Sequence, residues 1–170
     1  MAGNGPGDGS EAWPGRTPPE HLSDAGLDWL AEASPDPDTC RRQWRRGGSG
    51  LTMLPAGRRW DVLLVPGALG LPALAVLALT PRGLGPVLAD FGDENLAFLV
   101  PPGTAARWLG TGVRVAGAGS WILLPPPSRR AGGCLRWLVA PDGSGRLTDP
   151  VLLELALHDA AAGLGDPCAR

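Results

Sequence analysis

Three consecutive prolines, Pro125–Pro127, interrupt the most strand-like part of this 170-residue chain. Proline has no backbone N–H donor and a nearly fixed φ, so a central strand cannot continue through this segment. Apolar, extended stretches lie on both sides, at 121–124 and 135–139, and a short alternating run precedes them at 113–115. The pattern predicts three strands, with the chain leaving the sheet at the prolines and returning after a pair of glycines.

The connection after the prolines is polar and basic. It begins with Ser128, Arg129 and Arg130, and Arg136 follows on the next predicted strand. Arginine makes planar, bidentate contacts with phosphate, so these four residues form a candidate nucleic-acid or phosphate-binding site. A solvated connection between two strands is the alternative interpretation, because loops are commonly polar without binding a ligand.

Periodicity and turn signals predict the other elements and the fold class. Helices are expected at 22–33, 68–79 and 103–109, and a last helix is expected to begin with Thr148 as its N-cap. Further strands are expected at 51–54, 61–65, 86–89 and 95–100. The strands at 86–89 and 95–100 are expected to pair as a hairpin. The order of elements predicts an α+β fold: a single domain with a mixed, mostly antiparallel β-sheet and flanking helices.

Composition divides the chain into four parts. Residues 1–21 are rich in Gly, Pro, Ser and acidic residues and bury too little apolar surface to fold, so a disordered N-terminal tail is expected. Residues 22–50 are interpreted as a helix and an Arg-rich linker. The α+β domain is expected at 51–163, followed by a flexible C-terminus at 164–170.

The Arg-rich linker contains a second candidate contact site. Trp44 is surrounded by four arginines, namely Arg41, Arg42, Arg45 and Arg46. In a nucleic-acid-binding site, arginines hold the phosphate backbone while an exposed aromatic side chain stacks on a base. The arginines and Trp44 have the residue types for such a site. The alternative is a helical turn in which Trp44 docks on the domain and the arginines balance nearby acidic residues in water. Trp108, Trp121 and Trp137, by contrast, lie in apolar contexts typical of core or half-buried positions.

Charge and cysteine usage limit the classes of function. The net charge of −2 and the pI of about 5.6 argue against a protein that coats nucleic acid non-specifically. The three cysteines are far apart, so a zinc site is not expected. The sequence shows no secretory signal and no apolar stretch long enough to span a bilayer, which predicts a cytoplasmic protein without a membrane partner. The absence of lysine beside fifteen arginines indicates a GC-rich genome.

The order GSWILLPPPSRRAGGCLRW resembles the last part of the prim-pol domain. That is the N-terminal domain of bifunctional DNA primase/polymerases in the archaeo-eukaryotic primase superfamily. The shared features are a Gly-rich lead, an apolar strand, a Pro-Pro-Ser element, a Gly-containing turn and a strand with Trp, here Gly117, Gly119, 121–124, Pro126, Pro127, Ser128, Gly132, Gly133 and Trp137. The resemblance extends more weakly from Trp60 to Ala161, and is closest to short, stand-alone members from high-GC bacteria. It implies a primase/polymerase-like domain.

The resemblance also implies a chemistry, two-metal nucleotidyl transfer. The family uses two carboxylates one residue apart on a strand, a histidine on a neighbouring strand and a third carboxylate. Here Asp90 is the only carboxylate that ends an apolar strand, its nearest candidate partner is Asp93, and Asn95 stands where the family has its histidine. We therefore predict no catalytic residues, no metal site and no cofactor, with Mg²⁺ required only if the domain were catalytic.

Three functions stay open on the sequence alone. The first is a non-catalytic protein-interaction or regulatory module on a primase/polymerase-like scaffold. The second is a nucleic-acid- or nucleotide-binding domain of the same origin. The third is an active DNA primase/polymerase, a nucleotidyltransferase. The partner is accordingly either a protein or a nucleic acid.

Overall fold

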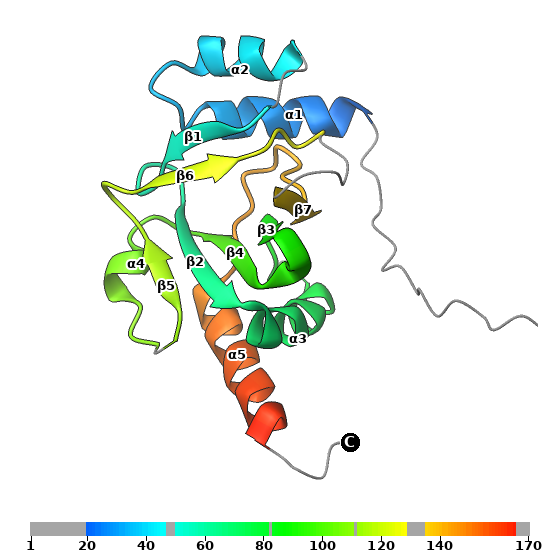
Figure 1. Ribbon diagram of the computed structural model, residues 1–170, viewed down its shortest axis with the longest axis vertical. Coiled ribbons are helices and arrows are strands. Elements are labelled where there is room, and N and C mark those ends of the chain that lie inside the picture. The colour runs from blue at the N-terminus through cyan, green and yellow to red at the C-terminus, as the bar shows by residue number, and fades with distance from the viewer. Residues whose placement is uncertain (1–19, 47–49, 82, 111, 129–134, 166–170) are drawn as a thin grey trace, which may run out of the picture.

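The computed structural model describes residues 20–46, 50–81, 83–110, 112–128 and 135–165 (Figure 1). Within them, five α-helices and seven strands form an α+β fold in which all strand neighbours are antiparallel. The predicted fold class is confirmed. Residues 1–19 of the tail that we expect to be disordered lie outside the described residues. No described helix has the length and apolarity needed to cross a membrane.

The larger sheet has five strands in the order β5-β2-β4-β3-β7. Their bounds are Arg114–Ala116 (β5), Asp61–Pro66 (β2), Asn95–Val100 (β4), Val87–Asp90 (β3) and Leu135–Val139 (β7). The predicted hairpin is present as β3 and β4, with Val87 opposite Phe98. Its turn contains a short 3₁₀ segment, η1 (Phe91–Asp93).

A separate two-stranded ribbon is formed by β1 (Thr52–Pro55) and β6 (Trp121–Leu124), with Met53 opposite Leu123. We call it the β1–β6 ribbon. The three strands expected between 113 and 139 therefore do not pair with one another. Instead, β5 and β7 lie at opposite edges of the larger sheet, and β6 joins a strand from much earlier in the chain.

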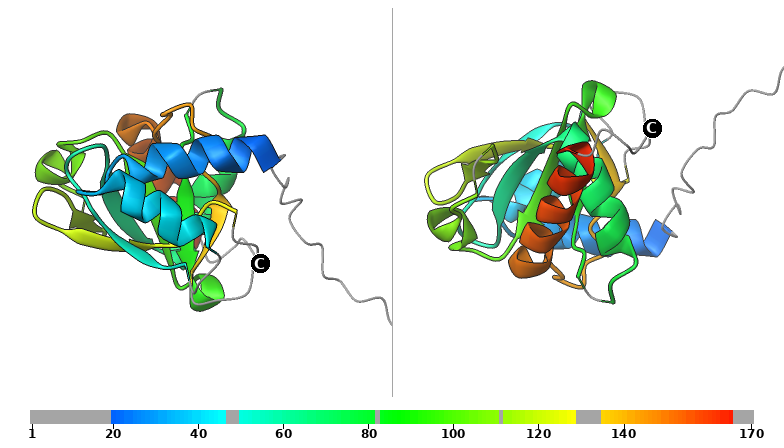
Figure 2. Two further views of the ribbon diagram at one scale, coloured as in Figure 1. Left: turned by 90° about the horizontal axis from the view of Figure 1, so that it is seen from above. Right: turned by 90° about the horizontal axis from the view of Figure 1, so that it is seen from below.

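Helices cover both faces of the larger sheet (Figure 2). On one face lie α3 (Gly67–Ala78) and α5 (Pro150–Gly165), whose Leu77 and Leu153 pack against Phe98 of β4. On the other side, α1 (Glu20–Ala31) and α2 (Pro37–Arg45) share a second core with the β1–β6 ribbon and the sheet. Trp60 is fully buried in this second core. The helical part of residues 22–50 thus packs as part of the globular structure.

The N-terminus of α5 differs from the prediction. Asp149, not Thr148, caps the helix, because its Oδ1 accepts hydrogen bonds from the backbone N–H groups of Val151 and Leu152. Thr148 is fully buried, and its Oγ1 accepts a hydrogen bond from the backbone N–H of Gly85 at 3.0 Å. The remaining helix, α4 (Thr104–Arg107), is one turn long.

Candidate functional site

A groove of about 730 Å³ lies between the β1–β6 ribbon and the larger sheet. We call it the ribbon groove. Its walls are mostly apolar and come from β2, β3, β4, β6 and β7, with a few polar groups at one end; the lining residues are Leu51, Val62, Leu64, Leu88, Ala89, Asp90, Glu94, Asn95, Ala97, Trp121, Ile122, Leu123 and Leu135. The size is typical of ligand-binding clefts.

The polar end of the groove is built by Asp90 and Asn95. Asp90 ends β3, and Asn95 begins β4 on the neighbouring strand. The backbone N–H of Asn95 donates to Asp90 Oδ1 at 2.8 Å, and its Nδ2 donates to Asp90 Oδ2 at 2.7 Å. Asp90 therefore closes the hairpin turn with both carboxylate oxygens. The two positions singled out by the sequence are in direct contact.

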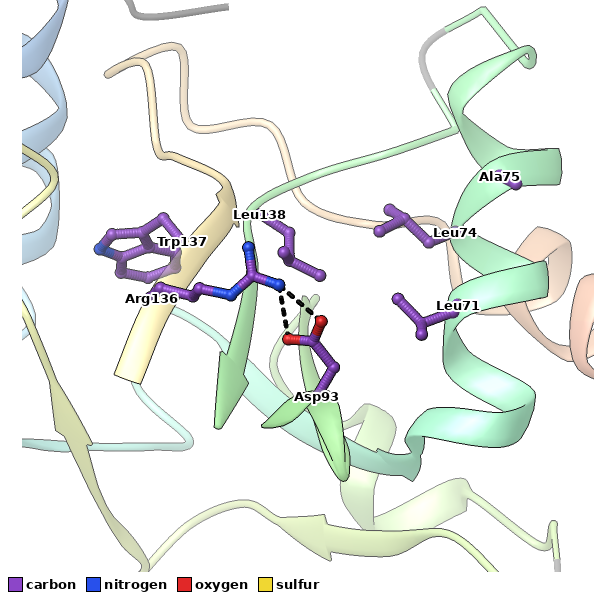
Figure 3. A pocket seen from close by; sticks show the side chains of 7 residues that line it. All are labelled: Leu71, Leu74, Ala75, Asp93, Arg136, Trp137 and Leu138. Carbon is purple, nitrogen blue, oxygen red and sulfur yellow. Dashed lines mark hydrogen bonds and ion pairs between the residues drawn. The ribbon is translucent and has the colours of Figure 1, made fainter. Parts of the chain in front are cut away.

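Asp93 does not join this pair. Gly92 and Asp93 have φ values of 76° and 56°, both in the left-handed region. Asp93 lines a different cavity, beside α3, and its two carboxylate oxygens accept hydrogen bonds from Nη2 of Arg136 at 2.7 and 2.5 Å (Figure 3). Within the described residues, no group of three or more His, Cys, Asp or Glu could hold a metal ion.

Of the four residues in the predicted phosphate-binding site, the structure describes two, Ser128 and Arg136. Ser128 is exposed at the end of a described segment. Arg129 and Arg130 lie outside the described residues. Arg136 lies on β7, and its side chain points to the α3 side of the sheet, where it forms the ion pair with Asp93. The structure therefore places Arg136 away from the lining of the ribbon groove.

Trp44 is not an exposed contact residue, so that part of the prediction is wrong. Only 5% of Trp44 is exposed, and its Nε1 donates a hydrogen bond to the backbone oxygen of Gly50 at 2.6 Å. Cys40 lies one helical turn earlier on α2 and is buried in the same core. The i, i+4 spacing of these two side chains was the available signal for a buried face.

The arginines around Trp44 are mostly engaged with neighbouring side chains. Arg41 forms ion pairs with Asp28 and Asp38, both at 3.0 Å, and Arg45 pairs with Asp28 at 3.4 Å. Arg42 donates to Thr39 Oγ1 at 2.6 Å, and Arg46 is exposed. The alternative interpretation, a docked Trp44 with arginines that balance acidic residues, agrees with this arrangement.

The sequence missed the apolar face at the mouth of the ribbon groove. Trp121, expected to be in the core or half-buried, is 51% exposed, and Leu123, two residues further along β6, is 40% exposed. Met53 lies opposite Leu123 and is also exposed. Alternation along β6 indicates that Trp121 and Leu123 share a face, but the partner strand was needed to show that this face is open.

Comparison with known protein families provides a match. Residues 10–153 match a family model described as bifunctional DNA primase/polymerase, N-terminal. The match begins well before residue 51 and so includes α1 and α2. A search of the curated proteins and a search of the solved structures each found no significant match.

Proposed function

Because this chain belongs to the family of bifunctional DNA primase/polymerase N-terminal domains, we propose that it uses the family's scaffold as a non-catalytic protein-interaction module. The ribbon groove receives an apolar segment of a partner protein that also carries a basic side chain. One observation carries this proposal: the groove is walled by apolar side chains, and its ionisable lining residues are acidic.

The polar end of the groove does not fit a pair of catalytic metal ions. Two-metal transfer needs carboxylates that converge on the ions. Here Asp90 directs its two oxygens at N–H donors of Asn95, and a donor at hydrogen-bond distance competes with a cation for the same lone pairs. Asp93, the partner that the sequence suggested for Asp90, is paired with Arg136 beside α3. These contacts support a scaffold without nucleotidyl transfer.

The open apolar face indicates what the groove binds. Trp121 and Leu123 expose about half of their surface at the mouth, and an exposed aromatic beside aliphatic groups is typical of a protein contact. Asp90 and Glu94 are the ionisable groups of the lining. Their charge repels phosphate and attracts Lys or Arg, so a peptide with apolar side chains around a basic residue is the complementary ligand.

Nucleic-acid or nucleotide binding is the second candidate. Trp121 is exposed enough to stack on a base, and Arg129 and Arg130 precede Leu135, a lining residue, by only a few positions. An active primase/polymerase is the third candidate, and it predicts Mg²⁺-dependent nucleotide incorporation. Salt separates the first two, because phosphate contacts weaken steeply with salt and apolar docking does not.

The test uses the purified full-length chain and two matched variants. Peptides selected from a random display library are expected to carry apolar residues around Lys or Arg. Their affinity, measured by fluorescence polarisation, should fall by about tenfold or more in Leu123→Glu. Leu109→Glu is the control, because Leu109 is 93% exposed and does not line the groove.

The same proteins are then tested with labelled single-stranded DNA at low and high salt, with and without Mg²⁺. Equal peptide binding by Leu123→Glu and the wild type would contradict the groove as the docking site. DNA binding that weakens steeply with salt and is lost in the Arg129→Ala, Arg130→Ala double variant would favour the second candidate. Nucleotide incorporation would contradict a non-catalytic module.

A further inference from the structure

A second cavity, of about 320 Å³, lies between α3 and β7 on the side of the sheet opposite the ribbon groove (Figure 3). We call it the α3 cavity. Its walls are apolar side chains of both elements, and one side carries the ion pair of Asp93 and Arg136; the apolar lining residues are Leu71, Leu74, Ala75, Trp137 and Leu138. Arg136 lines this cavity, whereas Leu135, its neighbour on β7, lines the groove on the other side of the sheet.

The ion pair leaves hydrogen-bond donors at the cavity. Both bonds to Asp93 come from one nitrogen of Arg136, Nη2, although a guanidinium has five N–H donors. Nη1 is directed away from the Asp93 carboxylate in Figure 3, and it makes no hydrogen bond to another described residue. Both oxygens of Asp93 accept bonds from Nη2. The remaining N–H donors of Arg136 therefore favour a ligand that supplies acceptors.

The backbone at Asp93 supports a specific arrangement of this pair. Asp93 is the only described residue other than glycine with a positive φ. The left-handed conformation costs an ordinary residue about 1–2 kcal/mol, although Asp tolerates it better than most. This left-handed backbone places the Asp93 carboxylate on the cavity side of the hairpin turn. There the carboxylate holds the Arg136 guanidinium at the cavity.

From the apolar walls and the donors of Arg136, we propose that the α3 cavity binds a small molecule with a short apolar chain and a single carboxylate. The apolar chain packs against Leu71, Leu74 and Leu138, and the carboxylate accepts hydrogen bonds from Arg136. A monoanion is preferred to a phosphate dianion because the negative charge of Asp93 is close by. The cavity volume has room for roughly ten non-hydrogen atoms at liquid density.

The test measures binding of octanoate to the full-length chain by isothermal titration calorimetry, with octylamine and octyl phosphate as head-group controls. Octanoate should bind, octylamine should not, and octyl phosphate should bind more weakly than octanoate. Arg136→Met should weaken octanoate binding by about tenfold or more, because a charge-assisted hydrogen bond is lost.

Ala75→Leu provides an independent check of the location. Ala75 is exposed on α3 and lines the cavity, so the added side chain should fill the cavity and prevent binding without loss of folding, as followed by circular dichroism. A wild-type chain that fails to bind octanoate would overturn the proposal. So would equal binding of octanoate and octylamine, stronger binding of octyl phosphate, or unchanged binding in Arg136→Met or in Ala75→Leu.

Discussion

Gly57 packs directly against Ala118, so that a Cβ atom on Gly57 would lie 2.4 Å from both the backbone N and the Cα of Ala118. Gly57 belongs to the connection between β1 and β2, and Ala118 to the connection between β5 and β6. In the same region the backbone N–H of Ala56 donates to the oxygen of Ser120 at 2.9 Å. This close approach ties the β1–β6 ribbon to the larger sheet at one end of the ribbon groove.

Gly57→Ala is expected to destabilise the protein strongly. The new methyl group meets backbone atoms, which cannot move aside as a flexible side chain can, and φ at Gly57 is +88°. Gly112→Ala is the matched control, because φ there is +77° but no atom lies within 4 Å of the added Cβ. Urea denaturation should show a loss of about 1–2 kcal/mol for Gly112→Ala and a clearly larger loss for Gly57→Ala. Equal losses would mean that backbone strain alone accounts for the effect.

Trp44→Ala should lower the free energy of unfolding by about 3–5 kcal/mol, the usual cost of removing a buried tryptophan. Trp44 belongs to the buried core that α1 and α2 share with the β1–β6 ribbon and the sheet, and its indole N–H donates a hydrogen bond to the backbone oxygen of Gly50. Arg46→Ala, an exposed change on the same segment, should alter stability by less than about 0.5 kcal/mol. A small effect of Trp44→Ala on the urea midpoint would contradict its placement in the core.

Asn95→Asp is expected to destabilise the protein near neutral pH by about 1–3 kcal/mol, because it replaces a donor to Asp90 with a second carboxylate. Two carboxylates at this distance repel each other when both are ionised, and this repulsion is relieved when one of them takes up a proton at lower pH. The stability deficit relative to the wild type should therefore be largest at neutral pH and shrink as the pH falls. The measurement is urea unfolding across this range. Asn95→Ala should instead show a deficit of about 1 kcal/mol that changes little with pH.

The stability of the protein should fall between pH 9 and pH 11 because of Cys40. Burial raises the pKa of the Cys40 thiol from 9.0 to about 11, so the unfolded chain loses this proton at a lower pH than the folded chain. The sequence contains no lysine and no tyrosine, which leaves cysteines as the side chains that titrate in this window. In a Cys134→Ser, Cys168→Ser background, the urea midpoint should fall as the pH rises through the window. Adding Cys40→Ala should remove most of that fall.

Local patterns predicted much of the fold. The β3–β4 hairpin follows from two apolar runs with a short Gly-containing turn, and the strand at β6 ends at the prolines because they cannot continue a ladder. Asp90 was singled out because it ends an apolar strand, and Asn95 because it stands where the family resemblance expects a histidine; the predicted hairpin then brings the two positions close together. Asp93 could not be placed in the same way, since its direction depends on the left-handed backbone at Gly92 and Asp93.

Local sequence patterns were enough to specify the type and approximate position of most elements, because apolar periodicity, proline and glycine act on the nearest few residues of the chain. The pairing of the strands depended instead on the packing of segments that are distant in the sequence. β6 hydrogen-bonds to β1, about seventy residues earlier, and not to β5 or β7 beside it in the sequence. That long-range pairing opens the ribbon groove and exposes Trp121. Tertiary packing also placed Arg136 beside α3, where it pairs with Asp93. The face of the sheet on which a strand residue lies depends on the register of that strand with its neighbours, which local sequence does not specify.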